Sequence, residues 1–135
     1  MKTVVNNDYK YSELTGRIIG CAIEVHNVLG PGFQEKIYQR ALGIEMSLQG
    51  LSFIMEYENT IFYKAEIVGR RRSDFLVEDN VSVELKAVSM MDDADLCQAI
   101  NYLEVYHLEV GLLINFGARR LVYKRLINSK VQDPC

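Results

Sequence analysis

The sequence predicts an α/β fold in which a mixed sheet, an antiparallel meander plus a β-α-β crossover, is flanked by helices. Two observations predict this class: apolar residues recur at helical spacing in the first third of the chain, and strand-like segments rich in Ile, Phe, Tyr and Val follow. The chain has 135 residues, 49% of them hydrophobic and 24% charged, which suits one domain with a buried core. We expect a single domain over residues 1–135, with its core at about 12–127.

Two helices are predicted to open this domain. The first covers residues 13–29, with an apolar stripe at helical spacing, Ser12 as its N-cap and Gly30-Pro31 as its end. The second runs to about Gln49, and Gly50 suits the position after a helix. Its expected buried residues are Ile37, Ala41, Leu42, Ile44 and Leu48.

The remaining elements alternate between strand and helix patterns. Three strands of an antiparallel meander are predicted at residues 53–63, 66–77 and 81–87. A helix at 92–106, with Asp92 or Asp93 at its N-cap, then leads to an apolar strand at 110–116. These last elements and the third strand predict a parallel β-α-β crossover, and a strand at 121–127 closes the sheet.

Composition excludes several classes of protein. With a net charge of −3, the protein lacks the overall positive field that many nucleic-acid binders have. No apolar run reaches the roughly 20 residues that span a bilayer, and the first ten residues are polar, unlike a secretion signal. We therefore expect no membrane association and a cytoplasmic protein. Cys21, Cys97 and Cys135 form an odd set without C-x-x-C spacing, which predicts reduced thiols rather than a disulfide framework or a zinc site.

The turn between the second and third strands is centred on Asp79, and this centre fixes which residues face each other. In a simple hairpin Asp74 faces Glu84, and the neighbouring pairs are apolar. Lys86 shares the face of the two acids. Opposed side chains have Cβ atoms about 4.5 to 5.5 Å apart, so two carboxylates there destabilise the sheet unless something compensates.

Two compensations are open. Lys86 alone can pair with the acids, which is a structural role. Alternatively, the two carboxylates and a backbone carbonyl are hard oxygen ligands for Mg²⁺ or Mn²⁺. Lys86 is then free to stabilise negative charge on a phosphate or to orient a water, which suits phosphodiester hydrolysis.

The same residues carry a resemblance to a known family. Asp74 followed after nine residues by Glu84-Leu85-Lys86 resembles the D…(D/E)-x-K signature of the PD-(D/E)XK nuclease superfamily. Gly32-Phe33-Gln34-Glu35-Lys36-Ile37-Tyr38 resembles the motif of its GxxExxY branch. The resemblance covers about residues 14–126 in order. Its other segments are Glu24-Val25-His26, Leu29-Gly30-Pro31-Gly32, Ala41-Leu42, Val83-Glu84-Leu85-Lys86-Ala87, Gln98…Asn101-Tyr102-Leu103 and Gly111-Leu112-Leu113-Ile114-Asn115-Phe116-Gly117.

The resemblance implies a restriction-endonuclease-like fold and a set of roles. Glu35, Asp74 and Glu84 would bind the metal together with the backbone of Leu85, and Lys86 would complete the catalytic set of Glu35, Asp74, Glu84 and Lys86. The residues expected to line the cleft are Tyr38, Gln98 and Tyr102, with a core position as the alternative for Tyr38. Arg70, Arg71 and Arg72 are expected to bind phosphates that flank the scissile one.

Two residues depart from the family pattern. Ser73 stands where the superfamily name has Pro, which leaves the metal chemistry untouched. Ala65 stands in a turn where relatives tend to have Gly, which affects the detail of that turn.

Two functions follow from the sequence. The first is a metal-dependent nuclease that uses Mg²⁺ or Mn²⁺ and acts on nucleic acid, with DNA favoured over RNA. The second is a catalytically silent nuclease-like module that binds nucleic acid or a protein partner, because an acidic chain of 135 residues leaves little surface for a specificity domain. A homo-oligomer is compatible with both.

Overall fold

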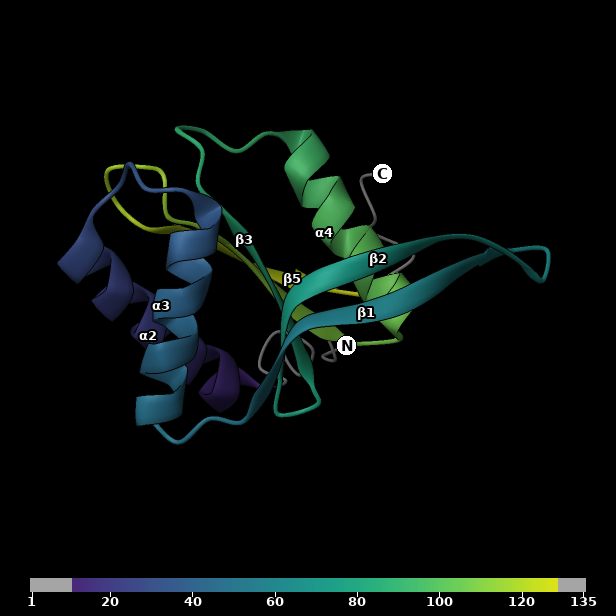
Figure 1. The fold of residues 1–135 in the computed structure, drawn as a ribbon, viewed down its shortest axis with the longest axis horizontal. Helices are drawn as coiled ribbons and strands as arrows, with labels where there is room; N and C mark the ends of the chain where they lie inside the picture. The colour runs from purple at the N-terminus through teal and green to yellow at the C-terminus, as the bar shows by residue number, and fades with distance from the viewer. Residues whose placement is uncertain (1–10, 129–135) are drawn as a thin grey trace, which may run out of the picture.

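The structure is a computed structural model that describes residues 11–128, so the polar first ten residues and Cys135 lie outside the described range. Its strands form one five-stranded sheet in the order β1-β2-β3-β4-β5 (Figure 1). The strands are Phe53–Tyr63 (β1), Glu66–Val77 (β2), Val81–Lys86 (β3), Val110–Asn115 (β4) and Val122–Ile127 (β5). The helices are Ser12–Leu29 (α2), Glu35–Leu48 (α3) and Asp93–Tyr106 (α4).

The strand pairing follows the predicted topology. β1 and β2, and β2 and β3, pair in antiparallel orientation, β3 and β4 pair in parallel orientation, and β5 returns antiparallel to β4. Helix α4 is the crossover between the two parallel strands. The predicted meander and β-α-β crossover, and with them the α/β class, are therefore confirmed.

The helices cover both faces of the sheet. One buried cluster joins α2 and α3 to alternate residues of the central strands, among them Val83, Leu85 and Leu112. A second, smaller cluster joins α4 to Leu113 and Leu126. Because neighbouring residues of a strand point to opposite faces, the division between Leu112 and Leu113 places α2 and α3 on one face and α4 on the other.

Helix α2 buries the predicted stripe, including Ile18 and Val25. It ends at Gly30, whose φ of 71° suits a residue without a side chain. Its start differs from the prediction, because Ser12 is already helical and Tyr11 is the N-cap. The Tyr11 carbonyl accepts hydrogen bonds from both the backbone N–H and the hydroxyl of Thr15, at 2.8 and 3.0 Å.

The predicted core face of helix α3 is right for Leu42, which is buried, and for Ala41, which packs against the core, but wrong for its other three residues. Ile37, Ile44 and Leu48 are exposed. The residues that α3 buries are Tyr38, Gln39, Leu42, Gly43 and Met46. Gly43 packs beside Phe53, where a Cβ atom would lie 3.5 Å from the ring, an ordinary van der Waals contact. Tyr38, Leu42 and Met46, spaced four residues apart, carry the buried face, and the apolar side chains away from it are left in solvent.

Helix α4 begins with a capping box. The Asp92 carboxylate accepts the backbone N–H of Asp95 at 2.9 Å, and the Asp95 carboxylate accepts that of Asp92 at 3.1 Å. Two otherwise unpaired backbone donors at the helix start are satisfied in this way. Asp92, one of the two predicted candidates, is the N-cap.

Two expectations concern the chain as a whole. Within residues 11–128, no helix has both the length and the apolar character needed to cross a membrane. Cys21 is a free, buried thiol. Cys97 is disulfide-bonded, so the expectation of reduced thiols is wrong for this residue. Spacing along the chain does not exclude a pairing that folding brings about.

Candidate active site

A polar pocket of about 140 Å³ lies where the start of α3, strands β2 and β3, and helix α4 meet. It brings together all four residues predicted to be catalytic, although they are up to 51 positions apart in the chain. The charged and polar residues that line it are Glu35, Arg72, Asp74, Glu84, Lys86, Asp95, Gln98 and Tyr102.

Strand alternation delivers two of these residues to one face of the sheet. Val83 and Leu85 of β3 belong to the core beneath α2 and α3. Glu84 and Lys86 therefore point to the face that carries α4. Glu84 pairs in register with Leu113, which lies in the apolar cluster beneath α4.

Asp74 lies at a gap in the hydrogen-bonding ladders of β2. The β2–β3 pairing ends at Phe75 and Val83, so the predicted register holds up to this pair, but Asp74 and Glu84 are not a paired position. Instead, the Asp74 carboxylate accepts the backbone N–H of Leu85 at 2.8 Å. The carboxylate thus takes the place of a backbone carbonyl and draws the acid toward β3.

Glu84 is the most strained group of the site electrostatically. It is 8% exposed, and its Oε2 atom is buried without a hydrogen-bond partner. Burial, reinforced by the charge of Asp74, raises the pKa of Glu84 to about 9. Burial also raises the pKa values of Asp74 and of Glu35, and in Glu35 the Asp74 charge adds to the effect. The pocket therefore holds three carboxyl groups that resist ionising together.

Lys86 forms an ion pair with Asp95 rather than with Asp74 or Glu84. Its Nζ atom lies 3.5 Å from the Asp95 carboxylate of α4, and both side chains are largely buried. Asp95 also belongs to the capping box, so its position is fixed by the helix start. The lysine lines the pocket in this position, and its charge offsets only part of the rise in the pKa values of Asp74 and Glu84.

The predicted cleft residues divide between the pocket and the core. Gln98 and Tyr102 line the pocket from α4, as expected from their spacing of four residues. Tyr38 does not line it: its side chain is fully buried and stacks on Phe116, with ring centroids 4.7 Å apart. The Tyr38 hydroxyl donates to the Gly30 carbonyl, so it holds the turn between α2 and α3. The expectation of a cleft position is corrected to the core alternative.

The three arginines lie on β2 before Asp74, as predicted, but in three different environments. Arg72 reaches the pocket and lies 3.5 and 3.8 Å from the carboxylates of Glu56 and Glu58. The Arg71 guanidinium stacks over the Tyr102 ring at 4.4 Å. Arg70 is exposed.

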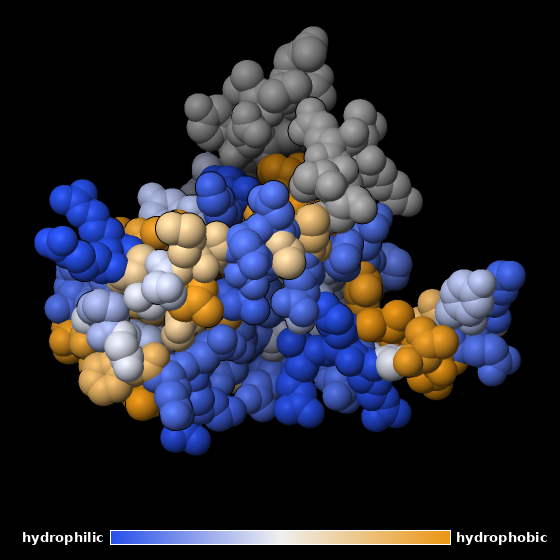
Figure 2. All heavy atoms as spheres, turned by 90° about the horizontal axis from the view of Figure 1, so that it is seen from above, coloured by the Kyte–Doolittle hydropathy of each residue, from blue (hydrophilic) through white to orange (hydrophobic). Residues whose placement is uncertain are grey.

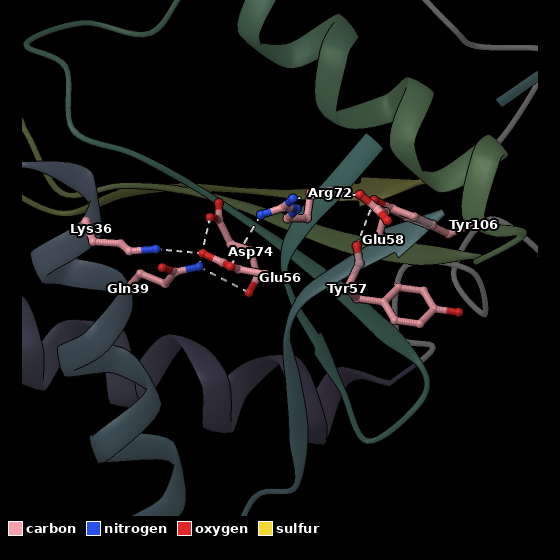
Figure 3. A network of polar contacts seen from close by, with 8 residues as sticks. All are labelled: Lys36, Gln39, Glu56, Tyr57, Glu58, Arg72, Asp74 and Tyr106. Atoms are coloured by element: carbon pink, nitrogen blue, oxygen red, sulfur yellow. Dashed lines mark hydrogen bonds and ion pairs between the residues drawn. The ribbon is translucent and has the colours of Figure 1, made fainter. Parts of the chain in front are cut away.

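Sequence reasoning missed Gln39, Glu56 and Asp95. Gln39 is buried and donates to the Asp74 carboxylate at 3.3 Å (Figure 3). Its spacing of four from Glu35 puts it on the same face of α3, a signal that was present in the sequence. Glu56 has a left-handed φ of 54° and bonds to Lys36 at 2.7 Å (Figure 3), and nothing in the strand pattern distinguishes it.

The donor set fits a divalent cation in its chemistry. Four carboxyl groups, those of Glu35, Asp74, Glu84 and Asp95, line one pocket, and Glu84 Oε2 is a buried oxygen that lacks a donor. Carboxylate oxygens are the ligands that Mg²⁺ and Mn²⁺ prefer. Within residues 11–128, no three Asp, Glu, His or Cys side chains are already arranged as a metal site.

Comparison with known proteins supplies the family. The solved crystal structure of SSO0001 superposes with a TM-score of 0.56 at 16% identity, over 90% of this chain and 61% of that one. This likeness supports the restriction-endonuclease-like fold. The comparison with curated proteins found no match. A family model described as the PD-(D/E)XK nuclease superfamily matches residues 12–126, which include every residue of the pocket. The chain therefore belongs to the PD-(D/E)XK nuclease superfamily.

Proposed function

We propose that this protein hydrolyses phosphodiester bonds of nucleic acid with the help of a divalent cation, Mg²⁺ or Mn²⁺, and that it belongs to the GxxExxY branch. The observation that carries the proposal is the buried, unpartnered oxygen of Glu84 in a pocket with Asp74 and Lys86. A cation supplies the missing partner. Members of the superfamily generally use divalent cations.

Each proposed role follows from position. Glu35, Asp74 and Glu84, with the backbone carbonyl of Leu85, would hold the cation. When bound, the cation supplies Lewis-acid polarisation of a phosphoryl oxygen and makes a nearby water more acidic. Lys86 would place its ammonium beside the developing negative charge on phosphorus, where a fixed cation stabilises the transition state.

The remaining pocket residues would bind and orient the substrate. Gln98 and Tyr102 line the pocket from α4 and present an amide and a ring to the nucleic-acid strand. The Arg70–Arg72 cluster would contact phosphates beside the scissile one. We further propose that the substrate is DNA rather than RNA and that the protein is cytoplasmic. Residues 12–127 would form the single domain that carries out hydrolysis.

A cleavage assay tests the proposal. The purified protein is incubated with single- and double-stranded DNA and RNA in Mg²⁺, Mn²⁺ or EDTA. Lys86→Ala leaves every proposed oxygen ligand in place, so metal binding should persist while cleavage falls by on the order of 100-fold or more. Lys124→Ala, an exposed lysine of β5, is the matched control and should cut like the parent. Equal cleavage by Lys86→Ala and the parent would show that the lysine is structural.

A silent binding module is the second candidate function. The ion pair between Lys86 and Asp95 favours it, because a lysine engaged with a helix start has a structural role already. The same assay separates the two. A parent that cuts no nucleic acid in any metal, yet binds it at low salt, is a module of this kind.

A further inference from the structure

Strands β1 and β2 extend beyond the rest of the sheet as a two-stranded arm. They pair from Phe53 and Val77 out to Tyr63 and Glu66, whereas β2 pairs with β3 only from Phe75 to Val77. Residues 58–72 therefore form a ribbon that projects from the body (Figure 1). At about 3.3 Å per residue, its tip lies about 30 Å along the strand from Asp74.

Helix α4 fixes the base of the arm. The Tyr106 hydroxyl donates to the carbonyls of Tyr57 and Arg71, at 3.2 and 3.1 Å. The Asn59 side chain donates to the Val105 carbonyl at 3.1 Å. The arm is thus held in a defined direction relative to the pocket, which α4 also lines.

The outer half of the arm exposes apolar side chains (Figure 2). Phe62, Tyr63, Ile67 and Val68 are each between 60% and 62% exposed. Phe62 and Ile67 are cross-strand partners, so their side chains are neighbours on one face. Four large exposed apolar side chains at the end of a narrow ribbon mark a contact surface.

The face that carries Phe62 and Ile67 is basic nearer the pocket. Alternate residues of β1 share a face, so Thr60 and Glu58 lie on the face of Phe62 and pair there with Arg70 and Arg72. The register shifts between Ile61 and Phe62, which leaves Val68 of β2 outside the pairing. From the pocket outward, this face therefore carries Arg72, which is paired with Glu56 and Glu58, then Arg70 and then the apolar pair. The arm as a whole has four cationic side chains against two carboxylates, a net charge of +2 in a chain of net charge −3.

We propose that the arm lies in the major groove of a DNA duplex beside the cleaved bond, with Arg70 on phosphates and Phe62 and Ile67 against thymine methyl groups. The inference rests on the proposed function for its substrate class. The major groove of B-DNA admits a two-stranded β-ribbon and displays the thymine methyl to apolar side chains. A-form RNA has a major groove too deep and narrow for side chains to read. A second copy bound arm to arm would bring two basic clusters together, whereas phosphates complement them.

The parent protein tests the inference without any substitution. Its affinity is measured by fluorescence anisotropy, in EDTA so that nothing is cut, for duplexes of about three helical turns, ~30 base pairs. The two duplexes contain either thymine or deoxyuridine, which differ only in the C5-methyl group. We expect the thymine duplex to bind about fourfold more tightly for each methyl contacted, the value of one buried methyl-sized group. Equal affinity for the two duplexes overturns the inference.

Two double variants assign any difference to the arm. Phe62→Ala/Ile67→Ala should bind the two duplexes equally, because it lacks the apolar pair. Ile44→Ala/Leu48→Ala removes apolar side chains that are 64% and 73% exposed on α3, and should keep the parent's preference. Retention of the preference by the arm variant overturns the inference. So does a fall in molar mass for that variant alone, which would identify a second copy as the occupant.

Binding in EDTA is independent of hydrolysis, so the two proposals can fail separately. A protein that prefers thymine duplexes through the arm but cuts nothing keeps this inference and loses the nuclease proposal. A protein that cuts DNA but shows no preference for thymine keeps the nuclease proposal and loses this inference.

Discussion

Glu84 is a carboxyl group that the fold removes from water while leaving one of its oxygens without a hydrogen-bond donor. An unsatisfied buried oxygen is expensive, and a charged one more so, which is why the raised pKa keeps the group protonated at neutral pH in the metal-free protein. The same burial that disfavours the free carboxylate makes it a strong ligand once a cation is present. In the proposed metal site, a cation would supply the partner that this oxygen lacks.

The stability of the metal-free protein should fall as pH rises. The folded protein holds the Glu84 proton up to a pKa of about 9, whereas the unfolded chain releases it near the ordinary value of 4.5. The folded state thus binds more protons between these values, so the stabilisation present below about pH 4.5 is lost as pH approaches about 9. Urea unfolding in EDTA across this range measures the effect. Glu84→Gln should remove most of the slope, because the amide stays neutral.

Glu24→Gln makes the same chemical change at an exposed position of α2 and is the matched control. Glu35 and Asp74, whose pKa values are also raised, add to the slope in the same direction. Parallel curves of unfolding free energy against pH for the parent and Glu84→Gln would contradict the assignment of the slope to Glu84.

The segment that follows β3 and Lys86 is held by the end of β4, where the Phe116 N–H donates to the Lys86 carbonyl at 2.9 Å. Asn115, at the end of β4, accepts the backbone N–H of Val88 at 3.0 Å and donates to its carbonyl at 2.8 Å. Gly117 then packs directly on this segment, because a Cβ atom there would lie 2.4 Å from the Val88 nitrogen. Asn115 and Gly117 therefore hold the chain in place at Val88, just beyond the proposed catalytic lysine.

Gly117→Ala should destabilise the protein by about 1–3 kcal/mol, since the added methyl overlaps backbone atoms that cannot move like a side chain. Gly20→Ala is a control of opposite sign: it lies on α2 with no atom within 4 Å of its new methyl, and should stabilise by about 0.5–1 kcal/mol. Thermal unfolding of both variants measures the difference. A Gly117→Ala protein as stable as the parent would mean that the backbone at Ala87 and Val88 can shift without loss of stability.

The positions of the strands and helices were predictable because their apolar residues recur with a clear strand or helix spacing. Residues 53–63 and 66–77 are strands over those bounds, and the hairpin register about Asp79 holds for three pairs. The buried face of α3 was not predictable, because its exposed Ile37, Ile44 and Leu48 look like a core stripe. The helix instead buries Tyr38, Leu42 and Met46, and because apolar residues lie on both sides of α3, their spacing alone does not decide its rotation.

The sequence predicted which residues form the site better than it predicted how they are arranged. Glu35, Asp74, Glu84 and Lys86 do line one pocket. The gap in both ladders at Asp74, where Glu56 has left-handed backbone, has no signature in the sequence because it arises from how β1, β2 and β3 separate. The sequence therefore could not predict the hydrogen bond from Leu85 to Asp74 or the ion pair between Asp95 and Lys86.

The molecule as a whole joins three elements at the pocket: the start of α3, the edge of the β2–β3 ladder and α4. Each contributes an acid or the lysine, and the sheet core holds the elements together from both faces. An ion bound there would contact Glu35 of the α3 side and the two strands at once. Because it would bind only the folded state, it would stabilise the whole protein.

Asp74→Asn tests this coupling between the ion and the fold. The asparagine oxygen can still accept the Leu85 N–H, and the cost of burying the Asp74 charge is removed, so the metal-free variant should melt at the parent's temperature or slightly above it. In the parent, Mg²⁺ or Mn²⁺ at a hundredfold excess over its dissociation constant should add about 2.7 kcal/mol, a rise of several degrees in melting temperature. Asp74→Asn should lose this rise, while Asp79→Asn, the same change in an exposed turn, should keep it. An equal metal-induced rise in the parent and Asp74→Asn would place the ion elsewhere, because a carboxylate replaced by an amide loses the charge that attracts a hard cation.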